Sequence, residues 1–267
     1  MKDIDFASRN TRSKFHKSNK ENCRITMTRW RQIGQTWCKW PAQPVGLIEM
    51  IGGSYLAASP QISYRRLLDD LAKRNLAVHA WSYIPGLDHQ AQANHAWRSM
   101  RSCKKSLESR IAKPLKIIRL GHSLGCKLHL LAPDGGRNSK GLITMSFNNF
   151  GANKSIPLLG KLAPRLGFYS EFSPSPEETL RLIRERYLQQ KNLLISFEED
   201  QLDQTPLLFN CLQTRQCDDS EQLHLNGDHL TPASAGFRHE VLGQWADDKI
   251  KRESLNRVVD EIYKWSS

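Results

Sequence analysis

The residues best suited to chemistry are Gly121–Gly125, a Gly-His-Ser-Leu-Gly segment. A predicted buried strand, Leu115–Leu120, precedes it without a gap, and an apolar helical face begins at Leu124. A serine between two such glycines, placed between a strand and a helix, is typical of a strained turn that lifts a nucleophilic hydroxyl above a sheet edge. We therefore predict Ser123 as a nucleophile. A side chain at either glycine, Gly121 or Gly125, would collide with neighbouring backbone; the alternative is a tight turn in which these residues serve geometry alone.

A serine hydroxyl is a poor nucleophile unless a histidine removes its proton and a carboxylate orients that histidine. In chains with such a turn, the acid and then the histidine follow the serine. His229 lies in a glycine-containing loop near the C-terminus, after a short predicted strand, Gln222–Leu225. We predict His229 as the general base. His224 lies within that strand and is expected to pack or to face solvent, whereas His122 is expected to form a wall of the site.

Two aspartates compete for the orienting role. Asp200 and Asp203 both follow the predicted strand Asn192–Phe197. Asp200 has the more usual spacing from the strand end, and Asp203 lies closer to Pro206. We favour Asp200 and keep Asp203 as the alternative acid, since either could also be a solvated turn aspartate.

Backbone N–H groups could hold the negative charge that develops on a carbonyl oxygen under attack. The N–H of Leu124 lies at a predicted helix start, and a second donor is expected after the first buried strand, where Ser54 follows Gly52–Gly53. The alternative for this pair is a plain glycine turn. No cofactor or metal is predicted, because a Gly-x-Gly-x-x-Gly segment is absent and the six cysteines show no zinc-ligand spacing.

The elements that must position these residues alternate between strands and helices. Alternation of this kind predicts an α/β fold with a mostly parallel, doubly wound sheet covered on both faces. A Trp-rich edge hairpin is expected over Trp30–Trp40, and a helix capped by Ser59 is expected to start at Pro60. Further strands are predicted at Val45–Ile51, Leu76–Tyr83 and Gly141–Phe147, and further helices at 89–111 and around 255–262.

Residues 148–191 interrupt the alternation. Their first half is irregular and rich in glycine and proline, and Ser175 then caps a helix with an acidic first turn. The insertion predicts a lid over the site; a loop and helix that only cover the core are the other interpretation.

The amino-acid composition restricts the domain organisation, the binding partners and the cellular location that can be expected. Residues 1–26 carry seven basic and three acidic side chains and few large apolar ones, which predicts a disordered leader before a domain at 27–267. The net charge of +12 favours anionic partners and leaves peripheral membrane contact open, but the scattered basic residues argue against nucleic acid. Cysteine usage favours a reducing compartment, and the cytoplasm is the expected location.

The Gly121–Gly125 turn, Asp200 and His229 together resemble the α/β-hydrolase superfamily. Several strings are similar to a narrower cyanobacterial and plastid family, domain of unknown function 1350, over about residues 27–265. These strings are Met50–Pro60, Ser63–Leu68, Gly121–Leu131, Ser146–Asn149 and Asp203–Thr205. The resemblance implies a hydrolase fold and a photosynthetic lineage, with no established substrate. In a plastid-bearing organism the expected location would be the plastid stroma.

The chain departs from the superfamily pattern at two places. The usual His-Gly after the first strand is Gly52–Gly53 here, and the usual glycine before the acid turn is Phe197. The second departure keeps Asp203 open as the acid.

The function expected from these residues is serine hydrolysis of an ester or thioester. Apolar residues in the insertion suggest an acyl or lipid-like substrate: Ile156, Leu158, Leu159, Leu162, Leu166, Phe168 and Phe172. The alternative is a non-catalytic member of the fold that acts as a binding or assembly factor, at a membrane surface through its basic face.

Overall fold

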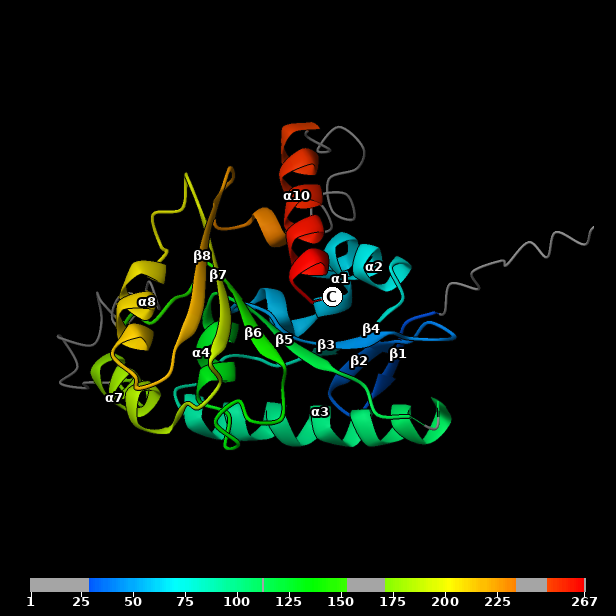
Figure 1. Ribbon diagram of the computed structural model, residues 1–267, viewed down its shortest axis with the longest axis horizontal. Helices are drawn as coiled ribbons and strands as arrows, with labels where there is room; N and C mark the ends of the chain where they lie inside the picture. Colours follow the sequence, from blue (N-terminus) through cyan, green and yellow to red (C-terminus); the bar gives the residue numbers. More distant parts are fainter. Residues whose placement is uncertain (1–28, 112, 153–170, 234–248, 267) are drawn as a thin grey trace, which may run out of the picture.

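The computed structural model describes residues 29–111, 113–152, 171–233 and 249–266 (Figure 1). The predicted leader and the centre of the predicted lid, residues 153–170, lie outside this part of the chain. The described strands form one eight-stranded sheet in the order β1-β2-β4-β3-β5-β6-β7-β8.

The sheet is mostly parallel, as predicted. Strands β3 to β8 run parallel to one another, and β1 and β2 form an antiparallel hairpin that pairs with β4, also antiparallel, at one edge. The strand bounds are β1 Arg31–Ile33, β2 Thr36–Lys39, β3 Gly46–Ile51, β4 Leu76–Trp81, β5 Ile117–His122, β6 Gly141–Met145, β7 Lys191–Phe197 and β8 Asp219–Leu225. Every residue of β3, β4, β5 and β6 is buried, because helices cover both faces of these central strands.

Helices α2 (Arg65–Lys73) and α10 (Lys249–Ser266) cover one face of the sheet (Figure 1). On the other face lie α3 (His89–Ile111), α4 (Leu124–Leu130), α7 (Pro176–Arg186) and α8 (Thr205–Gln213). No helix in the described ranges combines the length and apolar character that a membrane crossing requires.

Three local predictions need correction. The helix expected from Pro60 is split into α1 (Pro60–Ser63) and α2, with Tyr64 between them, and the Ser59 side chain makes no capping bond. Helix α8 was not predicted. Strand β8 starts three residues earlier than expected. Its first residues are polar side chains of an edge strand, so the sequence there has no apolar pattern from which a strand could be predicted. The Ser175 cap of α7 is confirmed, since its Oγ accepts from the Glu178 N–H.

The carboxyl ends of the parallel strands gather the candidate residues at one edge of the sheet. Strand β5 ends directly before Ser123, and β3 ends directly before the Gly52–Gly53 pair. Strand β7 ends three residues before Asp200, and β8 ends four residues before His229.

Candidate active site

Ser123 occupies a sharp turn between β5 and α4. Its φ of 53° and ψ of −122° lie in a region that non-glycine residues rarely adopt, and its N–H donates to the Met145 carbonyl. A Cβ at Gly121 would lie 2.7 Å from the Cα of Cys126, and one at Gly125 would lie 2.0 Å from the Ile51 carbonyl oxygen. Only glycine therefore allows α4 to pack this closely against the strands.

His229 lies between Ser123 and Asp200. Its Nδ1 is 2.8 Å from Asp200 Oδ2, and its Nε2 is 3.1 Å from Ser123 Oγ. A carboxylate oxygen accepts hydrogen bonds, so Nδ1 carries the proton in neutral His229. Nε2 is then left with a lone pair that faces the serine hydroxyl, the arrangement that proton abstraction requires.

The structure separates the two competing aspartates. The Asp200 side chain is fully buried; burial alone would raise its pKa, but the hydrogen bonds from His229 and from the Leu202 N–H lower the pKa on balance. The Asp203 carboxylate instead accepts from the N–H and hydroxyl of Thr205, at the start of α8. Burial raises the pKa of Asp203, and its carboxylate makes no hydrogen bond to His229.

The residues of the two predicted oxyanion donors border one cavity together with Ser123. Ser54 and Leu124 line the same cavity as Ser123, and neither N–H donates to a group among the described residues. Gly53 approaches Ser123 so closely that a Cβ there would lie 3.0 Å from the Cβ of Ser123. The Gly53 N–H is already used, because it donates to the Tyr64 hydroxyl.

Tyr64 and His122 form a buried hydrogen-bonded chain that the sequence did not reveal. His122 Nε2 is 2.8 Å from the His229 carbonyl oxygen, which can only accept, so Nε2 carries the proton. His122 Nδ1 then accepts from the Tyr64 hydroxyl at 2.7 Å, and the Tyr64 oxygen accepts from Gly53. Burial, with a smaller effect of the neighbouring His229, lowers the pKa of His122 to about 3, so the ring is neutral.

These hydrogen bonds tie together the loop that contains Gly53 and Ser54, the Gly121–Gly125 turn (the elbow) and the His229 loop. From the sequence, Tyr64 is one of several apolar residues on a predicted helical face, so nothing marks its hydroxyl as important. In the structure Tyr64 lies in the break between α1 and α2, and its hydroxyl bonds to Gly53 and His122. His122 was predicted as a wall of the site; it does line the cavity, and it also supports the backbone of His229.

A cavity of about 360 Å³ opens beside Ser123. Its lining combines the proposed reactive groups with apolar side chains, among them Leu56, Phe150 and Phe172. Of the apolar residues expected to contact substrate, Phe172 lies within the described ranges, and it lines this cavity. The volume is within the range of small-ligand sites.

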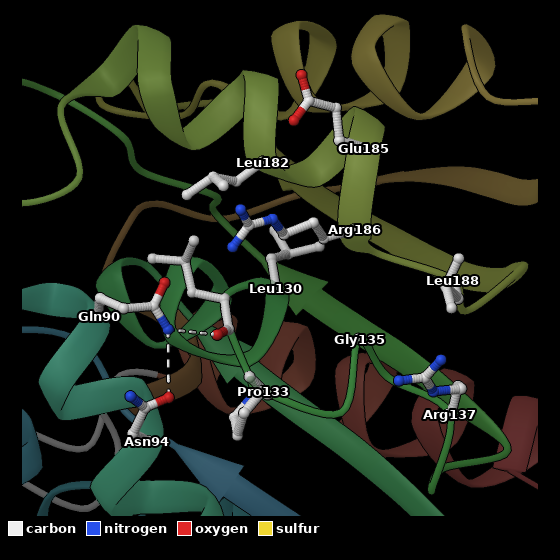
Figure 2. A pocket seen from close by; sticks show the side chains of 12 residues that line it. Gln90, Asn94, Leu130, Pro133, Gly135, Arg137, Leu182, Glu185, Arg186 and Leu188 are labelled. Carbon is white, nitrogen blue, oxygen red and sulfur yellow. Dashed lines mark hydrogen bonds between the residues drawn. The ribbon is translucent and has the colours of Figure 1, made fainter.

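A second cavity, of about 600 Å³, lies between α3, α7 and the C-terminal end of α4 (Figure 2). Gln90 bonds to Asn94 and to the Leu131 carbonyl at its wall. Ser123 lies at the opposite, N-terminal end of α4, so this cavity is separate from the candidate site.

Solved structures with a similar fold are esterases and lipases. Carboxyl esterase 2 (TmelEST2) from the mycorrhizal fungus Tuber melanosporum is 15% identical, with a TM-score of 0.57 over 86% of this chain and 80% of that one. A hyperthermophilic esterase from the archaeon Pyrobaculum calidifontis is 16% identical, with a TM-score of 0.57 over 89% and 86%. The monoacylglycerol lipase of Paleococcus ferrophilus is 13% identical, with a TM-score of 0.52 over 84% and 96%. These likenesses establish the α/β-hydrolase fold.

The sequence itself points to one family. No curated protein matches it. The family described as protein of unknown function (DUF1350) matches residues 29–267, which is nearly the whole chain. The chain therefore belongs to the DUF1350 family, and it has the α/β-hydrolase fold.

Proposed function

We propose that this protein is a serine hydrolase that cleaves an ester or thioester. The observation that carries the proposal is the pair of contacts made by His229, 3.1 Å to Ser123 Oγ and 2.8 Å to Asp200 Oδ2. A serine, a histidine and a buried carboxylate in this order and geometry form a nucleophile, a general base and an orienting acid.

The reaction would proceed in two steps. Ser123 Oγ attacks the substrate carbonyl while its proton passes to His229 Nε2, and the N–H groups of Leu124 and Ser54 stabilise the oxyanion. His229 then protonates the leaving alcohol or thiol, and the acyl group remains on Ser123. Water, deprotonated by His229, releases the acid and regenerates Ser123. Asp200 stays ionised and stabilises the imidazolium that forms in each step.

The acyl part of the proposal is supported by the apolar lining of the cavity and by the esterase and lipase folds of the structural neighbours. Contact with a membrane surface stays a prediction from the net charge of +12.

Labelling with a fluorophosphonate probe tests the proposal. We expect covalent labelling of the wild-type chain, none in Ser123→Ala and strongly reduced labelling in His229→Ala. Ser102→Ala, at an exposed position of α3, is the matched control and should label like the wild type. A folded wild-type chain that is not labelled and hydrolyses no ester would contradict the proposal and favour the non-catalytic alternative.

A further inference from the structure

Two buried polar side chains line the cavity beside Ser123 without a role in the proposed reaction. Lys127 is 1% exposed and His89 is 2% exposed. Lys127 lies four residues after Ser123, about one helical turn further along α4. His89 is the first residue of α3, which packs against α4. Both side chains therefore border the space that a substrate would fill.

Lys127 has hydrogen-bonding capacity to spare. Its Nζ donates to the Pro174 carbonyl at 3.1 Å, whereas an ammonium group has three N–H donors. Within the described ranges no carboxylate forms an ion pair with Lys127. Burial lowers the pKa of Lys127 to about 8, against the opposing effect of Glu171 and Glu177, so the group is still mainly charged at neutral pH. A buried cation that forms no direct ion pair is unfavourable, and an anionic ligand in contact with it would relieve this.

His89 also lacks partners. Its ring packs against Phe172 with centroids 4.2 Å apart and the ring planes tilted by 30°, and neither ring nitrogen forms a hydrogen bond to any described residue. Burial, together with the nearby charge of Lys127, lowers the pKa of His89 to about 3. The ring is therefore neutral and offers one N–H donor. Buried donors are seldom left unpaired in folded proteins unless a ligand or water takes their place.

We propose that Lys127 and His89 bind a carboxylate carried by the substrate, so that the natural substrate is an ester or thioester with a second, free carboxylate. One positive charge and one neutral N–H match a singly charged group. The negative charges of Glu171 and Glu177, which act on Lys127, repel any anion at this place, and they repel a doubly charged phosphate about twice as strongly as a singly charged carboxylate. The inference rests on the proposed hydrolase function, because it places this substrate against Ser123.

Binding to the full-length Ser123→Ala chain tests the site without turnover. The two ligands are monomethyl glutarate and methyl 5-methylhexanoate, in which an isopropyl group replaces the carboxylate. By calorimetry we expect the carboxylate compound to bind at least about tenfold more tightly, the effect typical of a charged hydrogen bond. Adding Lys127→Met should abolish this preference and leave the affinity for the neutral ester within about twofold. Lys105→Met, at an exposed position of α3, is the matched control and should keep the preference.

His89→Phe supplies a second variant with Lys127 intact. Phenylalanine keeps the packing against Phe172 and removes the N–H donor, so the preference should fall about three- to tenfold. Equal affinity of the Ser123→Ala chain for the two ligands, or binding of neither, would overturn the carboxylate site.

Turnover by the chain with Ser123 intact separates this inference from the proposed function. Ser123-dependent hydrolysis of both esters, without preference in rate or binding, would refute the carboxylate site and leave the hydrolase proposal standing. A carboxylate preference in binding that is lost in Lys127→Met, without hydrolysis of either ester, would support the site and contradict the hydrolase.

Discussion

The His122 imidazole donates to the backbone carbonyl of His229 across 2.8 Å, with the two ring centroids 5.1 Å apart. The residue before the proposed nucleophile thus holds the loop that carries the proposed base. Tyr64 extends the same chain to Gly53, next to the proposed oxyanion donor Ser54. Three loops that are distant in sequence are therefore fixed relative to one another by a single line of hydrogen bonds.

Tyr64→Phe should lower kcat about tenfold with little change in KM, because the substrate pocket persists while His122 and Gly53 lose their common partner. It should also lower the free energy of unfolding by about 1–3 kcal/mol, since buried polar groups are left unpaired. Tyr187→Phe is the matched control: its buried hydroxyl donates to Asn192, away from the site. That variant should lose similar stability in urea titrations and keep its kcat. Equal kcat values for the two variants would show that the Tyr64 hydroxyl is merely structural.

Asp200→Ala should mainly lower kcat, whereas Asp203→Ala should mainly lower the stability of the fold. Loss of the carboxylate that orients His229 should reduce kcat about 10³- to 10⁴-fold. Loss of Asp203 removes two bonds to Thr205 at the start of α8 and should destabilise the fold by about 1 kcal/mol, with kcat within a few-fold of the wild type. Steady-state kinetics and thermal unfolding of both variants make the comparison; the reverse ranking would assign the acid to Asp203.

Stability should fall as the pH decreases from about 6.5 towards 3. Burial lowers the pKa of His79, His89, His122 and His129 each to about 3. Between the ordinary histidine pKa near 6.5 and this value, the unfolded chain binds protons that the folded chain does not. The free energy of unfolding therefore decreases as the pH falls. Its slope against pH is proportional to the number of protons taken up on unfolding, to which each of these histidines contributes up to one.

Urea titrations at pH 7, 5.5 and 4.5 measure this slope. His79→Gln should reduce it by up to one proton, because the variant has one buried neutral histidine fewer. A free energy of unfolding that does not change across this interval would contradict the buried neutral state of these rings.

A buried ion pair supports the strand that carries the elbow. Arg119 of β5 donates to both carboxylate oxygens of Asp134, at 2.9 and 2.7 Å, with both side chains buried. Asp134→Ala would leave the guanidinium without its main partner and should destabilise the chain by about 3–5 kcal/mol. Calorimetric melting measures the loss. Fluorophosphonate labelling of the protein that remains folded should be unchanged, because Asp134 lies beyond the far end of α4 from Ser123.

The parts of the fold that the sequence predicted well depend on local patterns. Buried central strands are mostly apolar, and the strand–turn–helix around Ser123 is contained within one continuous segment. The polar half of β8 and helix α8 escaped prediction, since the first lies at a sheet edge and the second begins in a stretch with turn-forming residues.

The candidate site was predictable where chain order restricts the choice, and unpredictable where packing decides. The order serine, acid, histidine led to Asp200 and His229, while Asp200 and Asp203 could be separated only by the direction of their side chains. Nothing in the sequence around Lys127 or His89 indicates that their side chains are buried at the site. Their burial arises because the start of α3 meets α4 and Phe172, which are distant in the sequence.

The close contact between Gly125 and the Ile51 carbonyl has an evolutionary consequence. It joins two main-chain segments, so the spacing between the elbow and the end of β3 does not depend on which side chains surround it. Replacing Lys127, His89 or Phe172 in the course of evolution would then change which molecules the cavity binds, while the turn that presents Ser123 keeps its place.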